Sequence, residues 1–157
     1  MKKELTESDS HLNTLSTDLQ NVWHNTIPLS KAMNITIGYY DRQKLVTSCD
    51  LAFNKNLHNT MFAGSVYTLA TLTGWGWVYL LIQQEKIAGD IVLADANIRY
   101  HAPIEGIAFA ETEYSLNSGD CEKLRLNEKA KFTIEVIVKN GDKVAATFKG
   151  LYFVIPK

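Results

Sequence analysis

A long stretch without charge constrains this chain more than any other feature. Residues 61–84 contain no Asp, Glu, Lys or Arg, and most of them are apolar. The pattern predicts one helix that begins near Phe62 and ends near Lys86, before Gly89. A helix that is apolar on nearly all sides has to be surrounded by other elements, so the rest of the chain is expected to wrap around it.

The same stretch is long enough to cross a bilayer, since about 20 apolar residues suffice. Two observations favour a buried helix in a soluble domain. The flanking segments show no excess of positive charge on one side. Polar and small residues also lower the hydrophobicity of the stretch, namely Ser65, Thr68, Thr71, Thr73, Gly74 and Gly76. We therefore expect no membrane association.

The segments on either side of this helix have the composition and alternation of strands. They are residues 35–40, 45–51, 91–102, 107–116, 131–139 and 143–155. A short helix is expected within residues 118–127, and Asn140-Gly141 predicts a type I′ hairpin turn. The order is helix, two strands, long helix, four strands, which predicts an α+β fold with one long helix against an antiparallel sheet. A chain of 157 residues suffices for one such domain.

Alternation predicts which strand residues face the helix. In residues 91–102 the even positions are apolar, so Val92 and Ala94 are expected to point inward, and Asp95 and Arg99 outward. In residues 131–139 the inward positions are Phe132, Ile134, Val136 and Val138. Small side chains would let the helix lie close to a curved sheet, and those expected on apolar faces are Ala94, Ala96, Ala108, Ala110 and Ala146. Any helix surface left open would be covered by a partner subunit.

Residues 1–10 are polar and are expected to be disordered or frayed, which leaves residues 11–157 as a single domain. Apolar residues then recur at helical spacing, namely Leu12, Leu15, Leu19, Val22 and Trp23. They predict an amphipathic helix that Asp9 or Ser10 caps and that ends before Pro28.

Charge and composition exclude several kinds of partner. The 16 basic and 17 acidic residues give a net charge of −1, which predicts no binding to nucleic acid or to an anionic membrane. Cys49 and Cys121 lie in no redox or metal motif, so we expect reduced thiols in a cytoplasmic protein. No apolar core follows Lys2 and Lys3, so no secretion signal is expected. The absence of a Walker loop, a dinucleotide fingerprint and a metal cluster predicts no cofactor and no metal.

The loop before the long helix is rich in asparagine. Residues 54–65 place polar side chains and backbone N–H groups at the helix N-terminus, where the helix dipole favours negative charge. Such a loop suits a developing oxyanion. The alternative is an ordinary helix entry in which asparagine only caps the first turn.

Residues 60–70, followed by Gly74-Trp75-Gly76, closely resemble the thioesterase domain at the C-terminus of YiiD-type proteins. The long helix within an antiparallel sheet resembles the hotdog fold, and residues 95–103 resemble the third strand of such enzymes. The resemblance covers nearly the whole chain after the first ten residues. It implies hydrolysis of acyl thioesters of coenzyme A or acyl carrier protein. It also implies homodimers or dimers of dimers, with sites at the subunit interface.

The resemblance also implies a place for the thioester carbonyl. In one hotdog branch an Asn precedes the helix and a His-Gly-Gly opens it. Asn56 matches that Asn by spacing and Gly64 matches the second Gly, whereas Phe62 and Ala63 replace the His and the first Gly. Backbone N–H groups need no particular side chain, so an oxyanion hole at Ala63 and Gly64 is compatible with these changes.

The group that accepts a proton is harder to assign. The same branch carries a carboxylate farther along the helix, where this chain has Thr71. Asp95 is one substitute, although it could instead pair with Arg99 on the same strand face. His58 is the other substitute, because its side chain titrates near neutral pH, although a loop His is often only solvated.

Several neighbours are expected to contact the substrate. The predicted binding residues are Asn59, Thr60, Phe62, Ser65, Thr68 and Arg99. Ser65 and Thr68 share one side of the helix with Thr71, where they could hydrogen-bond water or the carbonyl, or only pack. Ser65 lacks the strand–turn context of a serine nucleophile. Arg99 could meet a phosphate of the carrier or remain solvated.

The sequence thus predicts an acyl thioesterase that uses water as the nucleophile. The alternative is a binding module that holds acyl thioesters without hydrolysing them, since the usual helical carboxylate is missing. A dehydratase of the same fold is a third possibility, which would need His58 and Asp95 to face one cavity.

Overall fold

The computed structural model describes residues 6–157. The helices are α1 (Glu7–Thr26), α2 (Pro28–Ala32), α3 (Ala63–Gln84) and α4 (Glu122–Arg125). The strands are β1 (Thr36–Tyr40), β2 (Lys44–Cys49), β3 (Gly89–Tyr100), β4 (Ala108–Glu113), β5 (Ala130–Asn140) and β6 (Lys143–Pro156). Two single turns of 3-10 helix, η1 (Leu51–Phe53) and η2 (Tyr114–Leu116), lie between them. The predicted α+β order is confirmed.

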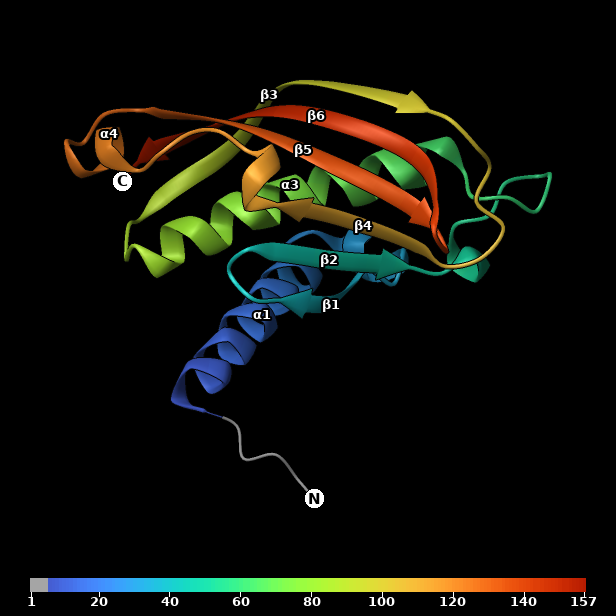
Figure 1. Ribbon diagram of the computed structural model, residues 1–157, viewed down its shortest axis with the longest axis horizontal. Coiled ribbons are helices and arrows are strands. Elements are labelled where there is room, and N and C mark those ends of the chain that lie inside the picture. The colour runs from blue at the N-terminus through green and yellow to red at the C-terminus, as the bar shows by residue number, and fades with distance from the viewer. Residues whose placement is uncertain (1–5) are drawn as a thin grey trace.

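The six strands form one antiparallel sheet in the order β1-β2-β4-β5-β6-β3. The sheet arches over α3, which packs against five of the strands and against α1 (Figure 1). The predicted inward residues of β5 are at most 1% exposed, namely Phe132, Ile134, Val136 and Val138. By length and composition α3 resembles a membrane span, but 67% of its most apolar window is buried in the protein. It is therefore the core helix of a soluble domain.

Helix α1 begins earlier than its sequence suggested. Thr6 and Asp9 form a capping box, in which the Asp9 N–H donates to Thr6 Oγ1 and the Thr6 N–H donates to the Asp9 carboxylate. The predicted cap at Asp9 or Ser10 is therefore wrong, and residues 7–10 are helical rather than frayed. The rest of the predicted frayed segment, residues 1–5, lies outside the described residues.

A β-bulge changes the phase of β3. The pairing with β6 shifts between Leu93 and Asp95, which places one extra residue, Ala94, in β3. Before the bulge the odd residues Ile91 and Leu93 pack on the core, and after it the even residues do. The prediction that Val92 and Ala94 point inward is therefore wrong, because strict alternation ends at a bulge. The other predicted alanines are buried or packed on the core: Ala96, Ala108, Ala110 and Ala146.

The β5–β6 hairpin forms as predicted but with a different turn. Asn140 pairs with Lys143, so the two loop residues are Gly141 and Asp142. Gly141 has a φ of 60° and Asp142 does not have a positive φ, which is the type II′ pattern. The expected type I′ turn is therefore wrong, although Gly141 carries the special conformation in both cases.

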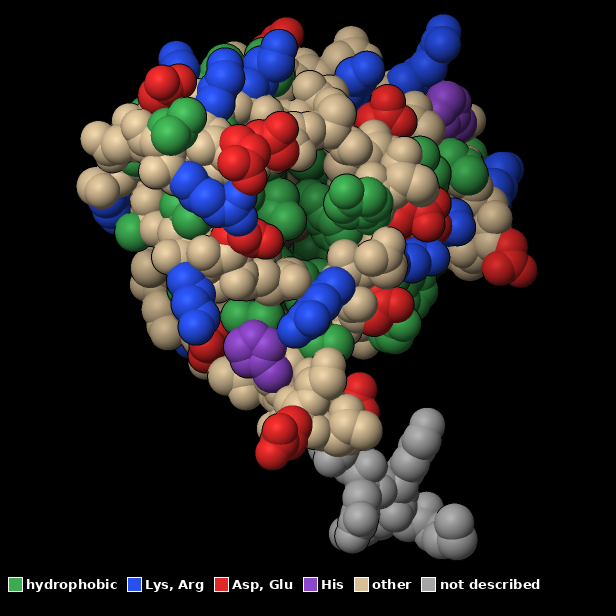
Figure 2. Space-filling model, turned by 60° about the vertical axis from the view of Figure 1, so that its left-hand side comes forward, with side chains coloured by type: hydrophobic (Ala, Val, Ile, Leu, Met, Phe, Trp, Pro, Cys, Tyr) green, Lys and Arg blue, Asp and Glu red, His purple; other side chains and the backbone are tan. Residues whose placement is uncertain are grey.

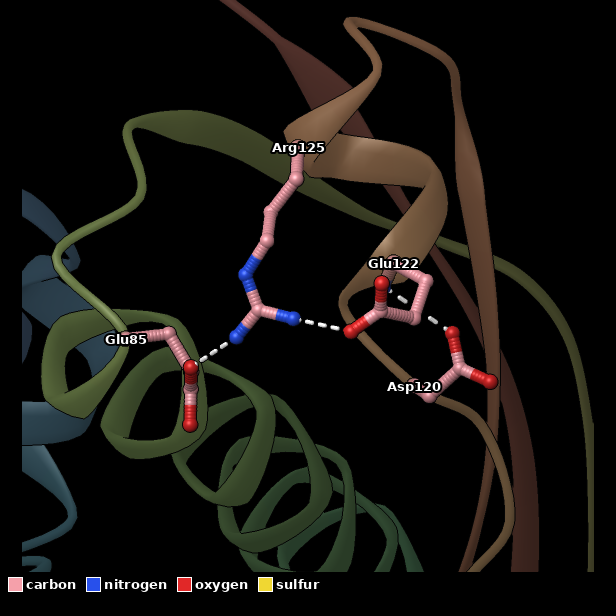
Figure 3. A network of polar contacts seen from close by, with 4 residues as sticks. All are labelled: Glu85, Asp120, Glu122 and Arg125. Carbon is pink, nitrogen blue, oxygen red and sulfur yellow. Dashed lines mark hydrogen bonds and ion pairs between the residues drawn. The ribbon is translucent and has the colours of Figure 1, made fainter.

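Helix α4 confirms the short helix expected within residues 118–127. Its Arg125 forms ion pairs with Glu122 of the same helix and with Glu85 at the end of α3 (Figure 3). The N–H of Glu122 donates to Asp120, which orders the turn before the helix. These contacts tie α4 to the C-terminal end of α3, far along the helix from its N-terminus.

Gly74 allows α3 to approach the sheet closely. A Cβ at this position would lie 2.4 Å from the hydroxyl of Tyr152, which is fully buried and donates to the Thr71 carbonyl at 2.7 Å. We expect Gly74→Ala to lower the free energy of unfolding by about 1–3 kcal/mol, because overpacking outweighs the better helix propensity of alanine. Urea unfolding measures this loss. Gly106→Ala is the control, since a Cβ there meets nothing within 4 Å, and equal losses in both variants would contradict the explanation.

Candidate functional site

The entry to α3 is held by backbone hydrogen bonds. The Phe62 N–H donates to the Asn54 carbonyl at 2.8 Å, and the Met61 N–H donates to the Ile104 carbonyl at 2.8 Å. Lys55 and Met61 also pair with each other as an isolated antiparallel β-bridge. The Asn-rich loop therefore closes on itself, and its two ends meet at the start of the helix.

The first turn of α3 presents unpaired donors. Phe62 is the N-cap residue and provides no side-chain hydrogen bond to the turn. Within residues 6–157, no acceptor is found for the N–H groups of Ala63 and Gly64, whereas the Ser65 N–H donates to the Phe62 carbonyl at 2.9 Å. A helix of 22 residues therefore directs two free N–H groups, and the positive end of its dipole, toward the same place.

A groove of about 350 Å³ lies beside these donors. Its α2 side is apolar, and its α3 side includes Gly64, Ser65 and Thr68. The remaining lining residues are Leu29, Ala32, Met33, Phe53, Asn54 and Phe62. The predicted contacts Phe62, Ser65 and Thr68 thus converge on one groove.

Asn54, rather than Asn56, is the asparagine of the groove. Its side chain is 3% exposed, and its Nδ2 donates to the carbonyls of Met33 (2.9 Å) and Asp50 (2.8 Å). Its Oδ1 is buried without a hydrogen-bond partner in the described residues. Sequence reasoning missed Asn54 because spacing to the helix favoured Asn56, and only the fold brings Asn54 against Met33.

Asn56 instead organises its own loop. Its Oδ1 accepts hydrogen bonds from the N–H groups of His58 (2.8 Å) and Thr60 (3.2 Å), and its Nδ2 donates to Thr60 Oγ1 (3.0 Å). Asn59 adopts a positive φ of 60° at the tip of this loop. His58 and Asn59 are exposed and line no part of the groove. The side chains of Asn56 and Thr60 are thus occupied with each other, as expected of an Asx turn.

Asp95 and Arg99 lie on the other face of the sheet. Both are exposed, whereas Ala96 and Ile98 between them pack on the core. The two side chains form no ion pair with each other in the part of the chain that the structure describes. Neither residue lines the groove, and His58 does not line it either.

Tyr100, at the end of β3, contacts the start of α3. The sequence alone predicted only that this residue lies in a strand. Its hydroxyl donates to the Ala63 carbonyl at 2.8 Å, which joins the end of β3 to the first turn of α3. Burial raises the pKa of this phenol, and Tyr67 raises it further. Tyr100 therefore acts as a neutral hydrogen-bond donor that orients the peptide between Ala63 and Gly64.

One side of α3 is only half-buried. This half-buried stripe consists of Tyr67, Thr71, Trp75 and Tyr79. Thr71, at the position of the helical carboxylate in the related branch, has a buried Oγ1 without a partner in the described residues. Trp75 stacks on Tyr79, and its Nε1 donates to the Ile91 carbonyl of β3 at 3.2 Å. Tyr67 packs edge-on against Phe148. The stripe runs beside β3, whose outer edge has no neighbouring strand within residues 6–157.

A second hollow lies at the opposite end of α3. Figure 2 shows apolar side chains at its floor and charged side chains around it. Two cavities of about 220 and 100 Å³ share Trp77, Leu81 and Tyr114 as walls. No predicted site residue lines either cavity, so the hollow is separate from the helix N-terminus.

Neither cysteine is an activated nucleophile. Burial raises the pKa of the Cys49 thiol to about 12, so the thiolate is absent near neutral pH. Both cysteines are free and buried. Within residues 6–157, no cluster of His, Cys, Asp or Glu is arranged to hold a metal ion.

Comparison with known proteins bears on the family and the fold of this chain. The family model described as "Putative thioesterase (yiiD_Cterm)" matches residues 16–156. The structure of a "putative thioesterase" from Shewanella oneidensis is 42% identical, with a TM-score of 0.88 over 92% of this chain and 100% of that chain. A protein of unknown function from Chlorobaculum tepidum is 28% identical, with a TM-score of 0.82 over 92% and 96%.

A more distant structure shares the fold alone. It is a "Probable Thioesterase" from Pseudomonas aeruginosa, 18% identical, with a TM-score of 0.72 over 90% of this chain and 95% of that chain. The long helix, the arched antiparallel sheet and these similarities identify a hotdog fold. The chain belongs to the thioesterase family defined by the C-terminal domain of YiiD.

Proposed function

We propose that this protein hydrolyses acyl thioesters of coenzyme A or acyl carrier protein at the N-terminus of α3. The observation that carries the proposal is the pair of unpaired N–H groups at Ala63 and Gly64, beside a groove of about 350 Å³. Two such donors and a helix dipole stabilise the negative charge that forms on a carbonyl oxygen under attack.

The reaction needs one water molecule and no cofactor. The water oxygen bonds to the thioester carbon while the carbonyl electrons move to its oxygen, which the Ala63 and Gly64 N–H groups bind. The electron pair on that oxygen then re-forms the carbonyl while the carbon–sulfur bond breaks, and the sulfur leaves with its bonding electrons. One proton from water ends on the sulfur and the other is released to solvent, which gives a thiol and a carboxylate. Asp95 and His58 remain the sequence-based candidates for the base that first accepts a proton.

A homodimer or a dimer of dimers is part of this proposal. The half-buried stripe with Trp75 and Tyr79, next to the unpaired edge of β3, supports a partner on that side. Such a partner could also bring a carboxylate to the groove, because its described lining residues include none. A cytoplasmic location is supported by the two free cysteines.

A panel of coenzyme A thioesters from acetyl to palmitoyl tests the proposal, with released thiol as the readout. We expect turnover above buffer for at least one chain length. A folded protein that releases no thiol from any of them, or from the matching acyl carrier protein thioesters, would contradict hydrolysis. Tight binding without turnover would favour the non-hydrolytic module, for which the lack of any carboxylate on α3 is the supporting observation.

A further inference from the structure

The groove beside α3 has both polar and apolar lining residues. Its polar side chains are those of Asn54, Ser65 and Thr68, and Gly64 brings one of the unpaired N–H groups beside them. Its apolar wall comes from α2 and the residue that follows it, through Leu29, Ala32 and Met33. A hydrocarbon chain that carries a carbonyl offers apolar and polar parts that match these two kinds of lining residue.

The apolar wall is fixed before any ligand binds. The two hydrogen bonds of Asn54 Nδ2 hold the end of α2, at Met33, against the turn at Asp50. The Met33 N–H donates to the Leu29 carbonyl at 2.9 Å, and the Ile35 N–H donates to the Ser30 carbonyl at 2.9 Å. These two hydrogen bonds hold the C-terminal end of α2 in place. A wall that is ordered in advance raises affinity, because little ordering is needed when a ligand binds.

The groove also exposes large apolar side chains that nothing covers within one chain. Leu29 is 53% exposed, Phe53 is 65% exposed and Phe62 is 57% exposed, although all three line the same groove. Contiguous exposed apolar surface of this kind marks a binding site. This apolar surface lies next to the free N–H groups of Ala63 and Gly64, which favours the acyl part of a thioester as the occupant.

We propose that the acyl chain of the thioester lies in this groove between α2 and α3, and that Ala32 limits the chain length. The proposal rests on the proposed function for the position of the carbonyl. Ala32 is exposed at the end of α2, so a larger side chain there fills groove volume without disturbing the core. Residues of α2 would then decide which acyl groups are accepted.

Binding of non-hydrolysable S-alkyl thioethers of coenzyme A, with increasing alkyl length, tests the proposal by calorimetry. In the wild type we expect affinity to rise about fourfold per methylene until the groove is full, which corresponds to about 0.8 kcal/mol per buried methylene. In Ala32→Leu the rise should stop about three methylenes earlier, because leucine adds three carbons. Lys31→Leu is the matched control, since it adds a leucine at an exposed position of α2 that does not line the groove.

Two results would overturn the proposal that the acyl chain lies in this groove. One is the same chain-length limit in the wild type and in Ala32→Leu. The other is a change of oligomeric state in Ala32→Leu but not in Lys31→Leu, measured by analytical ultracentrifugation, which would identify the groove as an interface between copies of the chain. Thiol release, measured separately on the same proteins, distinguishes the two proposals. Length-dependent binding that Ala32→Leu shortens, without any turnover, would contradict hydrolysis and leave the groove in place.

Discussion

Ala63→Pro is expected to lower kcat about 100- to 1000-fold while the protein remains folded. Proline lacks an N–H, so this change removes one of the two donors at the proposed oxyanion site, and the loss of one such donor has an effect of that size. The helix tolerates the change because Ala63 is its first residue, where proline is favoured and the missing N–H leaves no helical hydrogen bond unmade. Phe62 already has the extended conformation (φ −59°, ψ 133°) that a following proline requires.

The control for this prediction is Ala63→Ser, which keeps the N–H and is expected to retain kcat within a few-fold. Both variants keep the Ala63 carbonyl that accepts from Tyr100, so the link between β3 and α3 is preserved. Thermal unfolding checks that the two proteins are equally folded. If Ala63→Pro turned over substrate as fast as Ala63→Ser, the carbonyl would not bind at this N–H.

Trp23→Ala is expected to lower the free energy of unfolding by about 3–5 kcal/mol, the range for truncating a buried aromatic residue. Trp23 is fully buried, and its ring lies where a Cβ on Gly76 would come within 2.6 Å of it. It therefore fills the space between α1 and α3, which a methyl group cannot do. Domains of this kind are stable by about 5–15 kcal/mol in total, so the loss should be large in a urea titration.

Trp23→Phe separates packing from hydrogen bonding. The indole Nε1 is buried without a partner in the described residues, so its removal leaves no unsatisfied group behind. We expect Phe to lose clearly less stability than Ala, because most of the ring volume remains. An unfolding free energy of Trp23→Ala within about 1 kcal/mol of the wild type would show that α1 does not contribute to the core.

The secondary structure was largely predictable because its signals are local. Helix α3 was evident from residues 61–84, where the absence of charge leaves a buried helix as the favoured reading. The inward face of β5 followed from simple alternation. The failures occurred where pairing with another segment intervenes. The bulge at Ala94 depends on the register with β6, and the turn at Gly141 depends on where the last pair of the hairpin forms.

The sequence by itself determined the central helix, the α+β order, the family and the presence of an Asn-rich entry to the helix. Only the tertiary structure decided which of those polar groups are available for chemistry. Asn54 and Asn56 are two residues apart, yet Asn54 is buried against Met33 and Asp50 in the groove, whereas Asn56 is consumed by hydrogen bonds in its own loop. The physical reason is that a side chain's role depends on which donors and acceptors surround it, and α2 reaches Asn54 only when the chain folds.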